Sequence, residues 1–407
     1  MIVKVECGNV SGKLKSKSSN KSVLIGAAFI MATSAVGPGF LTQTAEFTDK
    51  YASNLAFVIL ISIIFNIGVQ LNVWRVIGVS GMRGQDIANK LVPGLGYFVA
   101  TIVALGGLAF NIGNIGGAAL GLNVITGLNV RYGAIICGII GSMIFLCKET
   151  GVLMDNLTRI LVIIMIIIVS YVAVKTHPPI GEVIIRSVEP KNPKSLMIPI
   201  ITLLGGTVGG YITFSGGHRL IDSGITGINN IKEITNSAIL GVIIASIMRV
   251  LVFLAVLGVV NKGIGLDPSN PAASAFKSGA GIIGYKLFGI VLISAGLNTV
   301  IGAAYTSVSF LKTLHPFIKK YEKYFIIGFI VFSTIVVAFI GKPANLLILA
   351  GALNGLILPI TIGVMLVASR KKDIVGEYIH PNWMLILGIL IVIASSYAGI
   401  MSITNIF

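Results

Sequence analysis

Long apolar stretches separated by short polar loops run from residue 23 almost to the end of the chain. Most are near or above the roughly 20 residues that a helix needs to cross a bilayer, and most are apolar on every side. We therefore predict an all-α polytopic membrane protein with eleven transmembrane helices. The predicted segments are 23–48, 54–77, 94–121, 132–148, 157–175, 196–217, 236–260, 281–310, 324–341, 345–368 and 382–403.

The first segment contains a break that favours a transport function. Gly37-Pro38-Gly39 divides it, and proline removes a backbone donor and clashes with the preceding helical turn. Backbone groups freed in this way within lipid must be satisfied by protein, water or a ligand. Broken helices form the substrate sites of many transporters. A simple proline kink between packed helices is the alternative.

A second break lies five predicted helices later. Residues 205–211 read Gly-Gly-Thr-Val-Gly-Gly-Tyr, and two glycine pairs weaken a helix. A small-residue packing face is the alternative. Breaks in segments one and six match a five-plus-five inverted repeat, in which the half-helix ends face each other at the membrane midplane. We predict repeats at 23–175 and 196–368 and an extra helix at 382–403, all within one transporter domain, 23–407.

Composition and charge fit this interpretation. Only 11% of the residues are charged, against about 25% in soluble proteins. The net charge is +16, but the basic residues lie at helix ends, so no nucleic-acid partner is expected. With residues 1–22 as a basic cytoplasmic tail, most lysines and arginines fall on the cytoplasmic side, and an odd helix count places the C-terminus outside. We predict a multi-pass protein of the cell (inner) membrane.

Few residues suggest chemistry on a substrate. No Ser-His-Asp set, HExxH motif or phosphate loop occurs, so we do not expect an enzyme. Cys7, Cys137 and Cys147 have no metal or disulfide spacing, and no cofactor is predicted. The oligomeric state is left open.

The residues at the breaks are similar to those of one known family. The relevant stretches are 25–30 and 37–40, then Gln70, Arg75 and Gly81 in the same register, and 204–211. They resemble the NRAMP family of divalent-metal transporters, which has the LeuT-like fold. The resemblance implies that fold and transport by alternating access.

At the first break the chain departs from the family's metal site. Gly37 stands where the family has a metal-binding Asp, and Phe40 where it has an Asn. Gly351 corresponds, less securely, to a tenth-helix Gln. Asn111 and Asn114 stand where the family has an Asp and a Glu associated with proton movement. Asn cannot titrate, so the resemblance does not extend to that proton path.

The second break departs in the same direction. Gly209, Gly210 and Tyr211 stand where the family has Met, Pro and His. Hard divalent metals need oxygen ligands, usually with a carboxylate, and softer ones favour imidazole or sulfur. None of these side chains is left at the matched positions, so no metal site is predicted from them.

Without metal ligands, the breaks suggest an organic substrate. We expect Gly37, Gly209 and Gly351 to make the pocket roomier, and Phe40 and Tyr211 to add aromatic faces. Amides at half-helix N-termini can receive a carboxylate. We predict secondary transport of a small solute, such as an amino acid or similar metabolite. The alternatives are transport of Mg²⁺ or Mn²⁺ through a remodelled site, and a non-transporting membrane sensor.

Other polar residues within the spans extend the candidate site. Arg249 lies within a span, either as a fixed cation or in an ion pair, because a buried charge is costly. Glu46 is a weaker candidate for coupling or gating, with Asn111 and Asn114. His218 is expected to cap a loop. The predicted substrate-binding residues are Gly37, Pro38, Gly39, Phe40, Gln43, Gly209, Gly210, Tyr211, Gly351 and Asn354.

Overall fold

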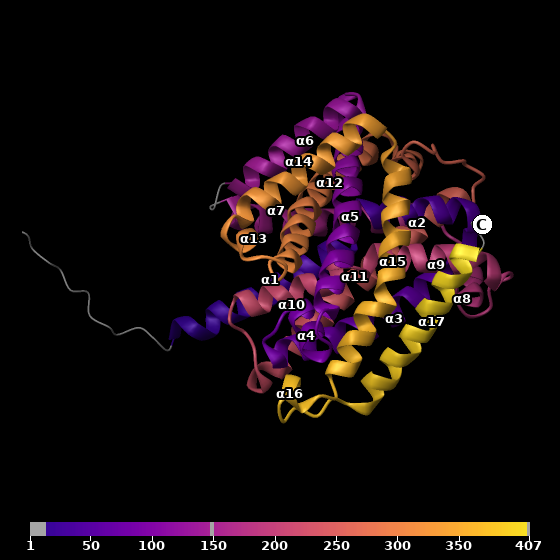
Figure 1. Ribbon diagram of the computed structural model, residues 1–407. Helices are drawn as coiled ribbons and strands as arrows, with labels where there is room; N and C mark the ends of the chain where they lie inside the picture. The colour runs from indigo at the N-terminus through magenta and orange to yellow at the C-terminus, as the bar shows by residue number, and fades with distance from the viewer. Residues whose placement is uncertain (1–13, 147–149, 405–407) are drawn as a thin grey trace, which may run out of the picture.

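The computed structural model describes residues 14–146 and 150–404, with side chains at 23–146, 160 and 163–401. Within these ranges the chain is helical and has no strand (Figure 1). The α-helices are α1 (Leu14–Ala35), α2 (Pro38–Tyr51), α3 (Leu55–Ser80), α4 (Gly84–Leu91), α5 (Leu95–Thr126), α6 (Val130–Leu146), α7 (Thr150–Thr176), α8 (Ile180–Val188), α9 (Met197–Thr207), α10 (Tyr211–Asp222), α11 (Ile231–Val260), α12 (Pro271–Leu311), α13 (Pro316–Lys320), α14 (Glu322–Ile340), α15 (Pro343–Ala368), α16 (Lys372–Val375) and α17 (Asn382–Thr404). Of the predicted cytoplasmic tail, residues 1–13 lie outside the described ranges.

Each predicted transmembrane segment coincides with helix, as far as the described residues reach. Eight helical stretches there are long and apolar enough to cross a membrane, or nine if the bent pair of α7 and α8 is one span. The first stretch, Val23–Ser80, includes α1, α2 and α3. The all-α membrane architecture is confirmed, whereas the number of eleven crossings stays a prediction.

Helix α12 begins at Pro271, earlier than the predicted start at residue 281. Asn270 caps it, because its side chain accepts a hydrogen bond from the amide of Ala273. Gly281 has φ +68° and ψ −163° and kinks the helix. The kink is permitted because glycine lacks a Cβ. The apolar run alone indicated a later start because Lys277 and Ser278 interrupt it just before Gly281.

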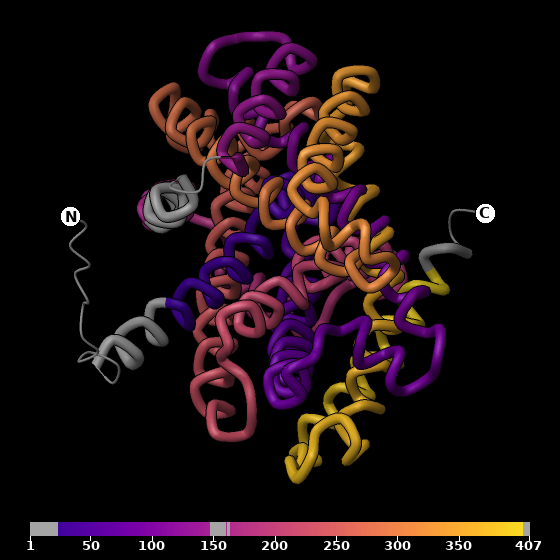
Figure 2. Tube along the Cα trace, turned by 60° about the vertical axis from the view of Figure 1, so that its left-hand side comes forward, coloured from indigo at the N-terminus to yellow at the C-terminus, as the bar shows by residue number. Residues whose placement is uncertain are grey.

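The centre of the molecule is formed by α5, α12 and α15. Helix α5 packs along α12, and α15 packs on both α5 and α9. Helix α1 lies against α11 and α10, and the indigo tube of α1 and α2 runs from the edge into the middle of the bundle (Figure 2). Helices α2 and α9, one half of each broken helix, both pack on α15.

Candidate functional site

The first break separates α1 from α2 as predicted. Helix α1 ends at Ala35 and α2 begins at Pro38, with Gly37 in an extended conformation (φ −67°, ψ 178°). Proline at the first helical position costs no hydrogen bond, since that amide has no intrahelical partner. The Leu41 amide donates to the Gly37 carbonyl at 3.3 Å, which closes the first turn of α2.

The second break separates α9 from α10, also as predicted. Gly210 has φ +56° and ψ −129°, a conformation that residues with a Cβ rarely adopt. The amides of Val208 and Gly209 both donate to the Leu204 carbonyl, at 2.8 and 3.0 Å. Helix α9 is therefore closed at its C-terminal end, and Tyr211 begins the next helix.

Gln43 on α2 joins the two breaks to α15. Its Nε2 donates to the Leu347 carbonyl at 2.7 Å, and its Oε1 is buried without a partner. A Cβ on Gly206 would lie 3.0 Å from the Gln43 Cδ, and a Cβ on Gly351 would lie 2.7 Å from the Thr202 carbonyl oxygen. Glycine at 206 and 351 thus makes room for the amide of Gln43 between α9 and α15.

Asn354 on α15 packs on the second break. Its Nδ2 donates to the Gly106 carbonyl at 2.8 Å, while its Oδ1 has no partner and lies against Gly210. A Cβ on Gly209 would lie 2.6 Å from the Asn354 carbonyl oxygen. The expectation that Gly209 and Gly351 make the pocket roomier is therefore wrong in this conformation, because neighbouring atoms fill both places.

The aromatic residues at the breaks are buried. Phe40 is 1% exposed, and the ring of Tyr211 meets Phe110 edge to face at 5.7 Å between centroids. Ser34 and Asn114 lie beside the Tyr211 hydroxyl, yet no side chain completes a hydrogen bond to it. A buried polar atom without a partner costs free energy, so this hydroxyl and the oxygens of Gln43 and Asn354 are groups that a ligand could satisfy.

Two of the predicted coupling residues, Asn111 and Glu46, form no side-chain hydrogen bond with the breaks among the described residues. Asn111 on α5 donates to Ser333 on α14 at 3.1 Å. Glu46 is half-buried, lies more than two turns along α2 from Gly37, and forms no ion pair within the described part of the chain. Of the acidic and amide candidates for coupling, Asn114 alone adjoins Tyr211 at the break.

Arg249 on α11 reaches the end of α9. It is fully buried, and its guanidinium donates to the Ser62 carbonyl at 2.9 Å and the Thr207 carbonyl at 3.4 Å. Its Nε has no partner, and no carboxylate of the described residues lies within ion-pair distance. No ion pair of Arg249 is therefore found within the described part of the chain, and its role as a fixed cation stays a prediction.

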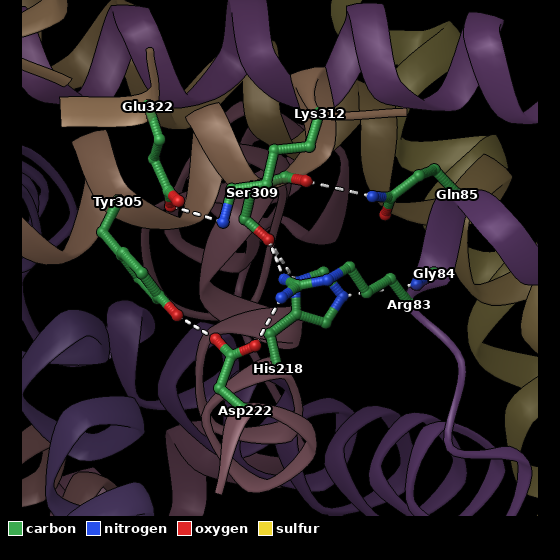
Figure 3. A network of polar contacts seen from close by, with 9 residues as sticks. All are labelled: Arg83, Gly84, Gln85, His218, Asp222, Tyr305, Ser309, Lys312 and Glu322. Atoms are coloured by element: carbon green, nitrogen blue, oxygen red, sulfur yellow. Dashed lines mark hydrogen bonds and ion pairs between the residues drawn. The ribbon is translucent and has the colours of Figure 1, made fainter. Parts of the chain in front are cut away.

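A second polar cluster, which we term the α10–α12 cluster, lies where α10 and α12 end (Figure 3). Arg83, just before α4, forms an ion pair with Asp222 at the end of α10. The Tyr305 hydroxyl donates to the same carboxylate. Lys312 pairs with Glu322 at the start of α14. These contacts hold α4, α10, α12 and α14 together at one end of the bundle.

His218 belongs to the α10–α12 cluster and, as predicted, contacts a loop end, here the first residue of α4. It is fully buried, and its Nε2 accepts from the Gly84 amide at 3.3 Å. Its Nδ1 lies 3.4 Å from the Ser309 hydroxyl, and Gln85 donates to the Ser309 carbonyl at 3.0 Å (Figure 3). The sequence analysis did not predict the contacts of this cluster, because the contacting residues are distant along the chain. The available signal was Asp222, an acidic residue at the end of the broken helix.

Comparison with known proteins decides the family. Residues 28–405 match the model of the Nramp family, natural resistance-associated macrophage protein-like. This chain belongs to the Nramp family. The predicted resemblance is thus confirmed, and Nramp members are transporters rather than enzymes.

Individual relatives add detail. The uncharacterized membrane protein YcsG of Bacillus subtilis is 56% identical over 94% of this chain and 95% of its own. The divalent metal cation transporter MntH of Vibrio campbellii is 21% identical over 92% of this chain and 90% of its own. Sequence similarity is therefore high to a protein without a described substrate and low to a metal transporter.

Solved structures show the fold. A manganese transporter of Eremococcus coleocola superposes with a TM-score of 0.71 at 16% identity, over 98% of this chain and 89% of that one. MhsT in complex with L-phenylalanine superposes with a TM-score of 0.59 at 16% identity, over 94% and 98%. The Nramp protein described here is thus a membrane transporter with the LeuT-like fold.

Proposed function

We propose that this Nramp protein moves a small organic solute by alternating access and that the solute binds between the two breaks. The proposal rests on one observation. The groups without partners around both breaks include the amide oxygens of Gln43 and Asn354 and the Tyr211 hydroxyl. These groups suit hydrogen bonds to an organic molecule.

The side chains at the breaks argue against a metal as the substrate. No group of three or more His, Cys, Asp or Glu side chains in the described residues could hold a metal ion. A divalent cation would have to exchange its water for neutral oxygens alone, which is unfavourable for a strongly hydrated ion such as Mg²⁺.

The α10–α12 cluster supplies a closure for one side of the site. Its contacts join the end of the broken helix α10 to α4 and α12. Opening toward that side requires these ion pairs and hydrogen bonds to separate. A closure of this kind next to a broken helix is what alternating access requires.

Transport in proteoliposomes tests the proposal. We expect the purified protein to accumulate at least one of a panel of radiolabelled amino acids, carboxylic acids and nucleobases, and Mn²⁺ to neither enter nor compete. The negative control is Gly210→Ala, because a side chain at φ +56° that also meets Asn354 distorts the break. Flux of Mn²⁺ or Mg²⁺ without flux of any organic solute would overturn the proposal.

Divalent-cation transport is the second candidate. It is favoured by family membership and by the manganese transporter with the same fold. The ion would bind with part of its water shell, held by carbonyl and amide oxygens. Calorimetric titration with Mn²⁺ and Mg²⁺ against the organic panel separates the two candidates.

A further inference from the structure

Arg249 is a buried cation whose guanidinium has more hydrogen-bond donors than the structure gives it acceptors. A guanidinium has five N–H groups, and the structure gives it two carbonyl partners, Ser62 and Thr207. Its Nε is buried and unpartnered, and no carboxylate of the described residues balances its charge. An unbalanced charge within a membrane protein is costly and is retained where it binds something.

The surroundings of Arg249 contain further unsatisfied amides. Ser62, Asn66 and Gln70 follow one another at four-residue spacing on α3, which places them on one helix face. All three are buried, and neither polar atom of the Asn66 or Gln70 side chain has a partner. Since Arg249 contacts the Ser62 carbonyl, Asn66 lies one helical turn along α3 from that contact and Gln70 two turns.

The same cation lies at the second break. Thr207 is the last residue of α9, and its carbonyl accepts from Arg249. The guanidinium therefore lies beside the second break, one of the two breaks between which we propose that the solute binds. An arginine edge binds a carboxylate through two parallel hydrogen bonds, and amide side chains donate to the same oxygens.

We propose that Arg249, together with Asn66 one turn along α3 from the Ser62 contact, binds a carboxylate group of the transported solute. The inference rests on the proposed function and narrows its substrate class to small carboxylates, amino acids included. The cation is built into α11, so the negative charge of the solute is balanced inside the membrane without a bound metal ion. Neutral and cationic analogues lack the group that the guanidinium recognises.

Paired ligands test this inference on the purified full-length chain in detergent. L-alanine is compared with L-alaninamide, L-lactate with lactamide, and benzoate with benzamide, by thermal unfolding followed through tryptophan fluorescence. We expect at least one acid to raise the melting temperature and its amide to leave it unchanged. In Arg249→Lys the apparent affinity for that acid falls by about tenfold, as for loss of one charge-assisted hydrogen bond.

Two further variants add a second loss-of-binding test and a control. Asn66→Asp places a carboxylate one turn along α3 from the Ser62 carbonyl that Arg249 contacts. If this carboxylate pairs with Arg249 in place of the solute, we expect a folded protein that no longer binds the acid. Ser246→Ala is the matched control, because Ser246 lies on the same helix and its hydroxyl also has no partner; binding is expected to be unchanged.

The outcomes separate this inference from the proposed function. Binding of an acid that survives in both Arg249→Lys and Asn66→Asp overturns the role of Arg249. Binding of amides or cations in preference to acids, or of nothing in the three pairs, overturns the carboxylate assignment, while organic flux in proteoliposomes would leave the proposed function standing. Stabilisation by Mn²⁺ or Mg²⁺ alone, together with flux of that ion, overturns both.

Discussion

Glycine at residue 351 shows how one missing side chain positions the candidate site. The space beside it holds the Gln43 amide and the Thr202 carbonyl oxygen. Gln43 in turn is fixed by its bond to Leu347. A single Cβ would therefore displace the side chain that joins α2 to α15, so stability and site geometry depend on the same residue.

Gly351→Ala is expected to lower the free energy of unfolding by about 1–3 kcal/mol, since its Cβ meets well-packed atoms. Gly363→Ala is the matched control on α15, because no atom lies within 4 Å of the position of its Cβ. Alanine also favours a helix over glycine, so the control should be neutral or slightly stabilising. Thermal unfolding in detergent measures both, and equal melting temperatures would contradict the packing argument.

His380 gives the protein a pH-dependent contact outside the spans. Its ring lies between the Tyr378 hydroxyl at 3.3 Å and the Asn72 amide oxygen at 2.8 Å. Burial, helped by the nearby Arg75 and Arg370, lowers the pKa of His380 to about 4 from an ordinary 6.5. The folded protein thus holds this ring neutral where an unfolded chain would protonate it.

Stability should therefore rise with pH between about 4 and 6.5, because over that interval the unfolded state binds the additional proton. The contribution is fully present above pH 6.5 and is lost as the pH falls toward 4. His380→Gln retains a donor toward Asn72 but cannot titrate, so its unfolding free energy should depend less steeply on pH. An identical pH slope in denaturant titrations of both proteins would refute this.

At the scale of helices, the sequence predicted the two helix breaks, because these depend on the residues at the breaks themselves. Both breaks follow from glycine and proline at the breaks themselves, and the structure confirms them at Gly37 and Gly210. The partners of Arg249 and His218 could not be predicted, because Ser62 and Ser309 are distant in sequence. The filling of space beside Gly351 likewise depends on tertiary packing rather than on local pattern.

The α10–α12 cluster should control access from one side of the bundle. Asp222→Asn removes the charge that pairs with Arg83, so α10 should separate from α4 more readily. We test this with a Ser215→Cys variant that lacks the three native cysteines. Ser215 is buried on α10, between the break and the cluster. Alkylation of the new thiol should become several-fold faster in Asp222→Asn.

Glu377→Gln serves as the matched control for the closure. Its partner is Lys372, and both side chains are largely exposed (89% and 82%). Exposed ion pairs contribute little, so alkylation at residue 215 should keep its wild-type rate. Equal acceleration in both variants would mean that general loosening, and not the Arg83 contact, governs access.

For the whole molecule, the charge distribution predicts how the bundle lies in the membrane. Lys371 follows α15 and Lys191 lies between α8 and α9, and both are exposed. The excess of lysine and arginine on the side of Lys371 predicts that this side is cytoplasmic. Lys191 belongs to the loop 176–195, which is then outside.

Cysteine labelling in intact cells measures this orientation directly. In a background without the native cysteines, Lys191→Cys should react with a membrane-impermeant maleimide added to whole cells. Lys371→Cys should react only after the cells are permeabilised, and it is the matched control because both positions are exposed loop lysines. Lys90 on α4 donates to the Asp373 carbonyl near Lys371, so Lys371 and the α10–α12 cluster, which includes the start of α4, lie at the same end of the bundle, and this result also fixes which side that cluster closes. Labelling of Lys371→Cys in intact cells would invert the predicted topology and make the cluster an outer closure.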